Sequence, residues 1–169
     1  PIADKVFVDA VSGELLAIHP TIHSARNRET YDAENQEFGP GTLRLSEGQT
    51  TSGDSVIDEI HANTGKTHAC VSTLFGRDSF DGAGATIVGV GHLSVGLVNA
   101  FWDGSQLLFG DGDGQLSGPL VVEDIVHHEF GHAVTQYTSA LIYESDSGAL
   151  NEAMSDVLAA ICQIHESGG

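Results

Sequence analysis

Two histidines separated by three residues constrain this chain more than any other feature. His128 and His132 flank Glu129 in the pattern H-E-x-x-H, within a stretch of helical spacing. Residues four apart on a helix lie one above the other on the same face, so both imidazoles can bind one Zn²⁺. Glu129 lies about a quarter of a turn away, close enough to take a proton from a water molecule activated by that metal. The alternative is a core helix in which the two histidines are only hydrogen-bonded.

The residues around this motif predict a buried helix. Pro119 suits a first helical turn, and Glu123 and Asp124 suit the positive end of the helix dipole. Two adjacent stripes then follow the helical period. They consist of Val121, Ile125, His128, His132 and Thr135, and of Val122, Val126, Glu129 and Ala133. We therefore expect a helix deep in the protein, with its metal-binding face at the floor of a cleft.

A second helix, opening within residues 147–156, offers the third metal ligand. Catalytic zinc needs three protein ligands and one open coordination position. Glu152 and Asp156 are four residues apart, so one can complete the site while the other orients a ligand histidine. The opposite, apolar face consists of Met154, Val157, Leu158 and Ile161. Because no Lys or Arg lies beside the acidic stripe, we expect it to pack against another element; a solvated acidic face is the alternative.

Three ordered stretches resemble the thermolysin-like neutral zinc metallopeptidases. They are residues 75–82, residues 99–114 with NAFWDG and GDGDG, and residues 126–156 with HExxHAVT and GALNEAxSD. Several long matches in a consistent order are far more specific than H-E-x-x-H alone. The resemblance implies an α+β, zincin-like fold. In it, a mixed, β-rich N-terminal lobe packs on a central H-E-x-x-H helix and on a second helix that carries the third zinc ligand.

The resemblance also implies a role for each matching side chain near the metal. The zinc ligands would be His128, His132 and Glu152. Glu129 would be the general base, and Asp156 would orient a ligand histidine. Tyr143 would donate a hydrogen bond to the developing oxyanion, a role that a phenol beside a metal can fill.

Substrate and calcium sites follow from the same resemblance. Asn99 and Ala100 would lie on an edge strand that binds the backbone of a peptide or protein substrate. Asp124 corresponds to a calcium-binding Asp, but Gln163 replaces a calcium-binding Glu, which counts against Ca²⁺ there. Residues 110–114 fail the EF-hand pattern, because Leu116 stands where the sharp-turn glycine belongs. We interpret them as a glycine-rich turn.

Charge and composition exclude several classes of partner. The formal net charge is −18, and all six Lys and Arg residues lie at or before Arg77. Such a chain is not suited to bind nucleic acid or an anionic membrane surface. No apolar run approaches membrane-spanning length. Cys70 and Cys162 agree equally with buried free thiols and, in a family that is usually secreted, with a disulfide.

The N-terminal residues form a separate predicted unit. Residues 6–16 read as two short strands around a turn and resemble the last hairpin of the propeptide of these peptidases. We predict two units: residues 1–30, which comprise a propeptide hairpin and a processing region, and residues 31–169, which form a metal-bearing lobe. The processing region is expected around residues 26–36, where the two units join. The alternative is a hairpin that belongs to the domain itself. Residues 31–102 should be mostly β-structure, with one helix between Ser52 and Phe75.

Two functions remain open. The first is a secreted zinc endopeptidase, whose C-terminal lobe, absent from this chain, would be its partner and would supply a further transition-state histidine. No residue here is assigned that role, although His92 and His127 are candidates for neighbours of the site. The second is a zinc-binding lobe without useful proteolysis, acting as a folded fragment or a binding module.

Overall fold

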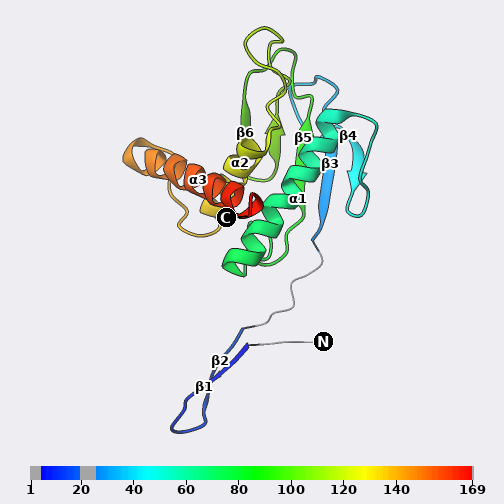
Figure 1. Cartoon of the computed structure of the whole chain (residues 1–169). Coiled ribbons are helices and arrows are strands. Elements are labelled where there is room, and N and C mark those ends of the chain that lie inside the picture. The colour runs from blue at the N-terminus through cyan, green and yellow to red at the C-terminus, as the bar shows by residue number, and fades with distance from the viewer. Residues whose placement is uncertain (1–4, 20–25, 169) are drawn as a thin grey trace.

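The computed structural model describes residues 5–19 and 26–168, which form an α+β fold (Figure 1). The helices are α1 (Ser55–Phe75), α2 (Glu123–Gln136) and α3 (Ser145–Glu166). The strands are β1 (Lys5–Val8), β2 (Leu15–His19), β3 (Arg28–Asp32), β4 (Thr42–Ser46), β5 (Ile87–Gly91), β6 (Ala100–Trp102) and β7 (Leu107–Phe109). The predicted α+β fold, with a mixed sheet, one early helix and two later helices, is confirmed. Residues 31–102 are not mostly β-structure, however, because strands cover fewer of them than α1 does.

Five of the strands form one mixed sheet in the order β4-β3-β5-β7-β6. β3 pairs in parallel with β5, and β5 with β7, whereas β4 and β6 run antiparallel to their neighbours. The short strand β6 is the last in this order, so one of its edges is free of a strand partner within the described sheet. An edge of this kind can bind an extended peptide through main-chain hydrogen bonds.

Helix α1 packs on β3 and β5, α2 packs on β6, and α3 packs on α2 (Figure 1). The start of α1 is fixed by Asp54, whose carboxylate accepts hydrogen bonds from the backbone N–H groups of Val56 and Ile57. A side chain at Gly89 of β5 would come within 2.5 Å of Ile60, so glycine allows α1 to approach the sheet closely. Helix α1 therefore packs on the sheet and also contacts α2.

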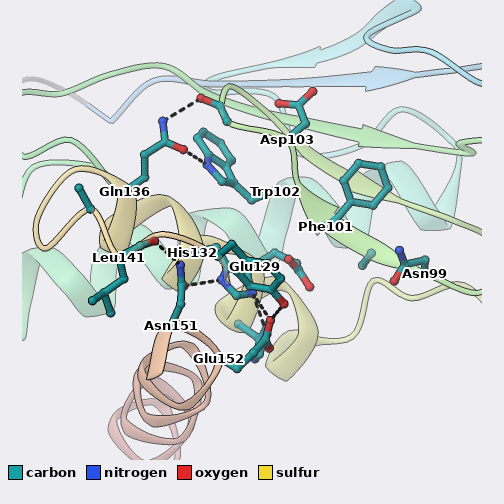
Figure 2. Close-up of a pocket in the computed structure, with 15 residues that line it drawn as sticks. Asn99, Phe101, Trp102, Asp103, Glu129, His132, Gln136, Leu141, Asn151 and Glu152 are labelled. Carbon is teal, nitrogen blue, oxygen red and sulfur yellow. Dashed lines mark hydrogen bonds and ion pairs between the residues drawn. The ribbon is translucent and has the colours of Figure 1, made fainter. Parts of the chain in front are cut away.

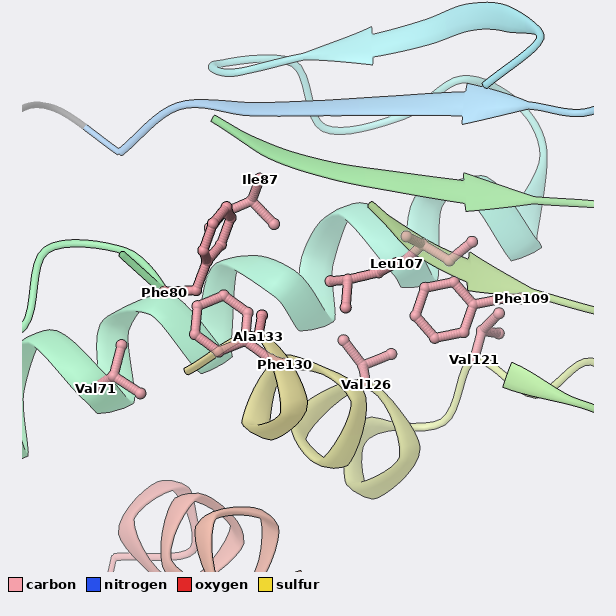
Figure 3. Close-up of a cluster of buried hydrophobic side chains, with 10 residues drawn as sticks. Val71, Phe80, Ile87, Leu107, Phe109, Val121, Val126, Phe130 and Ala133 are labelled. Carbon is pink, nitrogen blue, oxygen red and sulfur yellow. The ribbon is translucent and has the colours of Figure 1, made fainter. Parts of the chain in front are cut away.

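The main core fills the space between the sheet, α1 and α2 (Figure 3). It consists of Ile60, Val71, Phe80, Ile87, Leu107, Phe109, Val121, Val126, Phe130 and Ala133. A smaller cluster contains Ala33, Val90, Leu93 and Leu108. The main core packs against the inner side of α2, which leaves the opposite side of that helix to carry His128 and His132.

Two details of the helices differ from the sequence-based expectation. Helix α2 begins at Glu123, after Pro119 and Val121, so these two residues lead into the helix instead of forming its first turn. The acidic stripe of α3 does lie against another element, as expected, because Glu152 and Asp156 are 3.1 and 2.8 Å from the ring nitrogens of His128 on α2. The apolar face of α3, however, is exposed at Met154 and Val157. The buried face of α3 carries small and polar residues instead. They are Gly148, Asn151, Ser155, Ala159 and Cys162.

The physical reason is the close contact between α2 and α3. Small side chains let the two helix backbones approach, so the larger apolar residues of α3 are displaced to the other side. These residues are exposed, and they include Leu150, Met154, Val157 and Ile164. Cys70 of α1 and Cys162 of α3 form a disulfide, which resolves the alternatives left open by the sequence.

The predicted N-terminal hairpin is present as β1 and β2, which pair with each other in a separate two-stranded sheet. The predicted boundary between residues 30 and 31 falls inside β3, which lies between β4 and β5. Residues 1–4, 20–25 and 169 lie outside the described residues. Within the described part, no helix has the length and hydropathy needed to cross a membrane.

Candidate metal centre

Three side chains from two helices converge at the mouth of a pocket. His128 and His132 come from successive turns of α2, and Glu152 comes from the second turn of α3. The Nε2 atoms of the two histidines are 3.1 Å apart. The carboxylate of Glu152 lies 3.1 Å from Nε2 of His128 and 3.5 Å from Nε2 of His132. The three ligand atoms lie within 4.8 Å of one another.

The other ring nitrogens of the two histidines fix which tautomer each one adopts. Nδ1 of His128 is 2.8 Å from a carboxylate oxygen of Asp156. Nδ1 of His132 is 2.8 Å from the side-chain oxygen of Asn151, whose amide group donates to the carbonyl oxygen of Leu141. Both oxygens are acceptors, so both Nδ1 atoms carry the proton. The two Nε2 atoms therefore present lone pairs.

This arrangement fits a cation. Two lone pairs and a carboxylate face one another at about hydrogen-bond distance, and none of the three can donate a hydrogen bond to the others. They repel one another unless a positive charge lies between them. Nitrogen and oxygen donors of this kind match the ligand set of catalytic Zn²⁺, and the supporting Asp156 and Asn151 act as the outer hydrogen-bond partners typical of zinc-binding histidines.

Glu129 points from α2 toward the same pocket and is 7% exposed. Burial raises the pKa of this carboxyl to about 7, although a hydrogen bond with the backbone of Trp102 opposes the shift. A bound metal cation lowers the pKa again, because it favours the charged form. A carboxyl whose pKa lies near neutrality can both accept and return a proton.

Tyr143 lies on the other side of the metal ligands, in the loop before α3. Its hydroxyl donates a hydrogen bond to Glu152, and its ring packs edge-on against that of His132, 5.8 Å between centroids. The side chain is otherwise largely open to solvent. The hydroxyl is therefore beside the metal ligands and accessible from the pocket.

The pocket itself is an open groove of about 690 Å³ between β6 and the two metal-bearing helices (Figure 2). Asn99, which precedes β6, and Ala100, its first residue, line it together with Phe101 and Trp102. The indole N–H of Trp102 donates to Gln136 of α2 at 2.8 Å, which ties the strand to the helix. The groove thus places a free strand edge beside the converging ligands.

The predicted calcium residue lies beside the metal ligands. Asp124 lines a second, smaller hollow with Asp156 and Gln163, which also borders His128. In the described part of the chain Asp124 joins no group of three ligating side chains. Residues 110–114 lie in an irregular loop that bends from residue 114 onward, instead of forming the expected turn. The carboxylate of Asp113 accepts hydrogen bonds from the backbone N–H groups of Gln115, Leu116 and Ser117.

Sequence reasoning missed some residues of this site. Asn151 was not assigned a role, although it directly precedes Glu152 in the matching stretch and its burial on α3 brings it to His132. Gln136 was also missed, and only its position one helical turn after His132 pointed to it. His92 and His127, the two candidate neighbours, are not among the described residues that line the pocket.

Comparisons with known proteins agree with this geometry. Residues 16–136 match the protein family described as thermolysin metallopeptidase, catalytic domain. An extracellular metalloprotease of Pectobacterium carotovorum is 39% identical over 143 residues, which cover 84% of this chain and 41% of that protein. A bacillolysin of Brevibacillus brevis is 46% identical over 138 residues, which cover 79% of this chain and 25% of that protein.

A solved structure is also similar. The precursor of protealysin, a metalloproteinase from Serratia proteamaculans, superimposes with a TM-score of 0.83 at 35% sequence identity. The match covers 86% of this chain and 46% of the protealysin precursor. The chain therefore spans about a quarter to a half of the length of the proteins that it matches here.

Proposed function

Because this chain belongs to the thermolysin metallopeptidase family, we propose that it is the metal-bearing part of a zinc-dependent endopeptidase that cleaves peptides or proteins. One observation carries the proposal. The Nε2 lone pairs of His128 and His132 and the carboxylate of Glu152 converge while Asp156 and Asn151 hold the Nδ1 protons. Zinc bound here supplies Lewis acidity, polarising a peptide carbonyl and lowering the pKa of a water molecule.

The surrounding side chains then supply the proton transfers. Glu129 is within the same pocket and accepts the proton of the attacking water, acting as general base. It afterwards donates that proton to the leaving amine. The Tyr143 hydroxyl turns from Glu152 to donate a hydrogen bond to the oxyanion that develops on the substrate carbonyl.

Substrate binding is proposed along β6. An extended peptide adds to the free edge of this strand through main-chain hydrogen bonds, with the carbonyl of Ala100 and the side chain of Asn99 contributing. Such binding tolerates many side chains, because the backbone makes most of the contacts. The preference for particular side chains then depends on surfaces other than β6.

A second candidate function rests on the exposed face of α3. Leu150, Met154, Val157 and Ile164 form an apolar stripe that the described residues leave open to solvent. A stripe of this kind is typical of a surface that packs against a further part of the protein. We propose that it contacts the C-terminal lobe, and that this chain by itself binds zinc with little proteolysis.

Secretion and processing are part of the same proposal. The Cys70–Cys162 disulfide is typical of an oxidising compartment, and one relative is named an extracellular metalloprotease. The separate β1–β2 hairpin and the similarity to a protealysin precursor support a propeptide origin for the N-terminal residues. A bound Ca²⁺ at Asp124 has little support, because Asp124 joins no cluster of ligating side chains in the described part of the chain.

The test combines metal content with cleavage of an internally quenched peptide, by the chain alone and by the full-length gene product. In the gene product, Glu129→Gln should keep one zinc at the His128–His132–Glu152 site while turnover falls by about 10²–10⁴-fold, because the amide cannot accept the proton. Glu59→Gln is the matched control, since this exposed α1 residue also loses one negative charge.

The outcomes separate the alternatives. Glu129→Gln activity within a factor of about two of the wild type would show that another group is the base. Equal turnover by the chain and the gene product would show that α3 needs no further lobe. Loss of zinc on Glu129→Gln would show instead that Glu129 supports the metal.

A further inference from the structure

His127, the residue next to the metal ligand His128, points away from the pocket into the packing between the three helices. Its side chain is fully buried. Nδ1 lies 2.6 Å from Oγ1 of Thr67 on α1, and that hydroxyl donates its own hydrogen to the carbonyl oxygen of Asn63 at 2.8 Å. The hydroxyl has only one hydrogen, so it accepts from Nδ1. Nε2 of His127 therefore presents a lone pair.

That lone pair faces two carboxylates. Nε2 is 3.6 Å from Oε1 of Glu123, on the first turn of α2, and 3.6 Å from Oε1 of Glu166, on the last turn of α3. It has no hydrogen-bond partner among the described residues. The three atoms lie within 4.8 Å of one another. Like the His128–His132–Glu152 site, this group brings imidazole nitrogen and carboxylate oxygen together as possible metal ligands. Here there is one imidazole and there are two carboxylates.

The spacing suits a small cation better than direct hydrogen bonds. A separation of 3.6 Å is too long for a hydrogen bond. Ligands held 2.0–2.1 Å from a tetrahedral zinc ion lie about 3.3 Å from one another. The two distances from Nε2 of His127 to the carboxylate oxygens therefore need to shorten by only a few tenths of an ångström to match such an ion.

The neighbouring groups orient the two carboxylates. Lys66 of α1 binds the other oxygen of Glu123, Oε2, at 2.6 Å, which leaves Oε1 directed at His127. Glu166 stands at the negative end of α3, where the helix dipole disfavours a carboxylate. Burial and the neighbouring carboxylate of Glu123 raise the pKa of Glu166 to about 7.

We infer that Glu123, His127 and Glu166 form a second zinc site, distinct from the catalytic centre, that fastens the last turn of α3 to α2. The two sites use different parts of the helices: the catalytic ligands lie in the middle of α2 and the first turns of α3. The second site lies at the start of α2, with His127 on a different side of the helix from His128, and at the end of α3. Together with the Cys70–Cys162 disulfide, it joins α1, α2 and α3 at one place.

The experiment counts zinc ions per chain after equilibrium dialysis and measures the affinity for zinc alone. The wild-type chain should bind two zinc ions. His128→Ala with His132→Ala should leave one, and adding Glu166→Gln to that double variant should weaken the remaining zinc by more than about 100-fold, because a direct ligand is lost. X-ray absorption of the double variant should show nitrogen and oxygen neighbours at about 2.0–2.1 Å.

Matched controls separate this site from loose binding to an acidic surface. Glu59→Gln removes the same charge from an exposed position of α1 and should keep the second zinc. Should the double variant misfold, Glu166→Gln in the wild-type chain must still lower the count from two to one. A wild-type chain with one zinc, or equal affinities for Glu166→Gln and Glu59→Gln, would overturn the inference.

Discussion

Gly131 of α2 lies directly against Ser155 of α3. A Cβ atom at residue 131 would be 2.7 Å from the Cα of Ser155 and 2.9 Å from its hydroxyl oxygen. His132 follows Gly131, and Glu152 lies three residues before Ser155, so this contact sets how closely the third ligand approaches the histidines. The approach of Glu152 to the two histidines thus depends on the absence of a side chain at residue 131.

Gly131→Ala should push the two helices apart. We expect the free energy of unfolding to fall by about 1–3 kcal/mol through overpacking, offset in part by the roughly 1 kcal/mol by which alanine favours a helix over glycine. Zinc affinity should fall as well. Urea unfolding and zinc titration measure both effects. Gly118→Ala is the control, because a Cβ there meets nothing within 4 Å; the same result for both variants would contradict the expectation.

Asp156 should affect zinc affinity without affecting folding. Its carboxylate accepts the Nδ1 proton of His128 at 2.8 Å while the side chain remains 75% exposed. Asp156→Ala removes the acceptor and should weaken zinc by about 10–100-fold. Asp156→Asn keeps an acceptor oxygen and should weaken it less. Competition with a chromogenic chelator measures the affinities, and equal values for wild type and Asp156→Ala would show that His128 needs no orienting partner.

The Cys70–Cys162 disulfide joins residues 92 positions apart in the sequence. The cross-link restricts the unfolded chain, so Cys70→Ala with Cys162→Ala should lower the free energy of unfolding by about 2–5 kcal/mol. Urea unfolding of the metal-free chain measures the loss. Reduction of the wild type with dithiothreitol should give the same change, and dithiothreitol should have no effect on the double variant. A stability that is unchanged in both experiments would contradict a stabilising role.

His92 should make stability depend on pH. Its Nδ1 is 2.8 Å from Asp111 and its Nε2 is 3.2 Å from Asp54. Burial acts to lower the pKa of His92, but the hydrogen bonds and charges of Asp111 and Asp54 outweigh it and raise the pKa above 6.5. The stabilisation is therefore full below pH 6.5 and is lost as the pH rises through the raised value.

His92→Asn is the variant for this test, because His92 has a φ of 53°, which asparagine tolerates. The wild type should be more stable than this variant at pH 6, and the difference should shrink as the pH rises toward 9. Other buried histidines also make stability depend on pH, such as His61, whose pKa is lowered to about 4 mainly by burial. They are present in both proteins, so their contributions cancel in the difference between wild type and variant. A difference that grows with pH would contradict the assignment.

The arrangement of the catalytic ligands was largely predictable, because it depends on local periodicity. His128 and His132 lie four residues apart on one helix, and Glu152 follows in a stretch with its own helical pattern. Asn151 was not predictable in the same way. Its role comes from its burial against α2, which depends on how two helices pack and not on the period of either one.

The faces of α3 show where hydrophobic periodicity fails. The pattern correctly grouped Met154 with Val157, but it gave no indication that this face is open and that the face with Ser155 and Ala159 is buried. Small residues carry little hydrophobic signal, yet they allow the closest packing. The parallel pairing of β3 with β5, with α1 between them in the sequence, likewise depends on long-range contacts.

The metal-bearing helices contain no lysine or arginine, since every basic residue lies at or before Arg77. The negative potential of their carboxylates therefore attracts cations from solution and raises their concentration around the groove. We therefore expect cations to reach this groove faster than they would reach a neutral surface. Added salt shortens the range of this attraction, because the screening length falls to about 10 Å at an ionic strength of 0.1 M. The ionic strength of the medium thus affects how quickly a cation reaches the groove, independently of how tightly the side chains hold it.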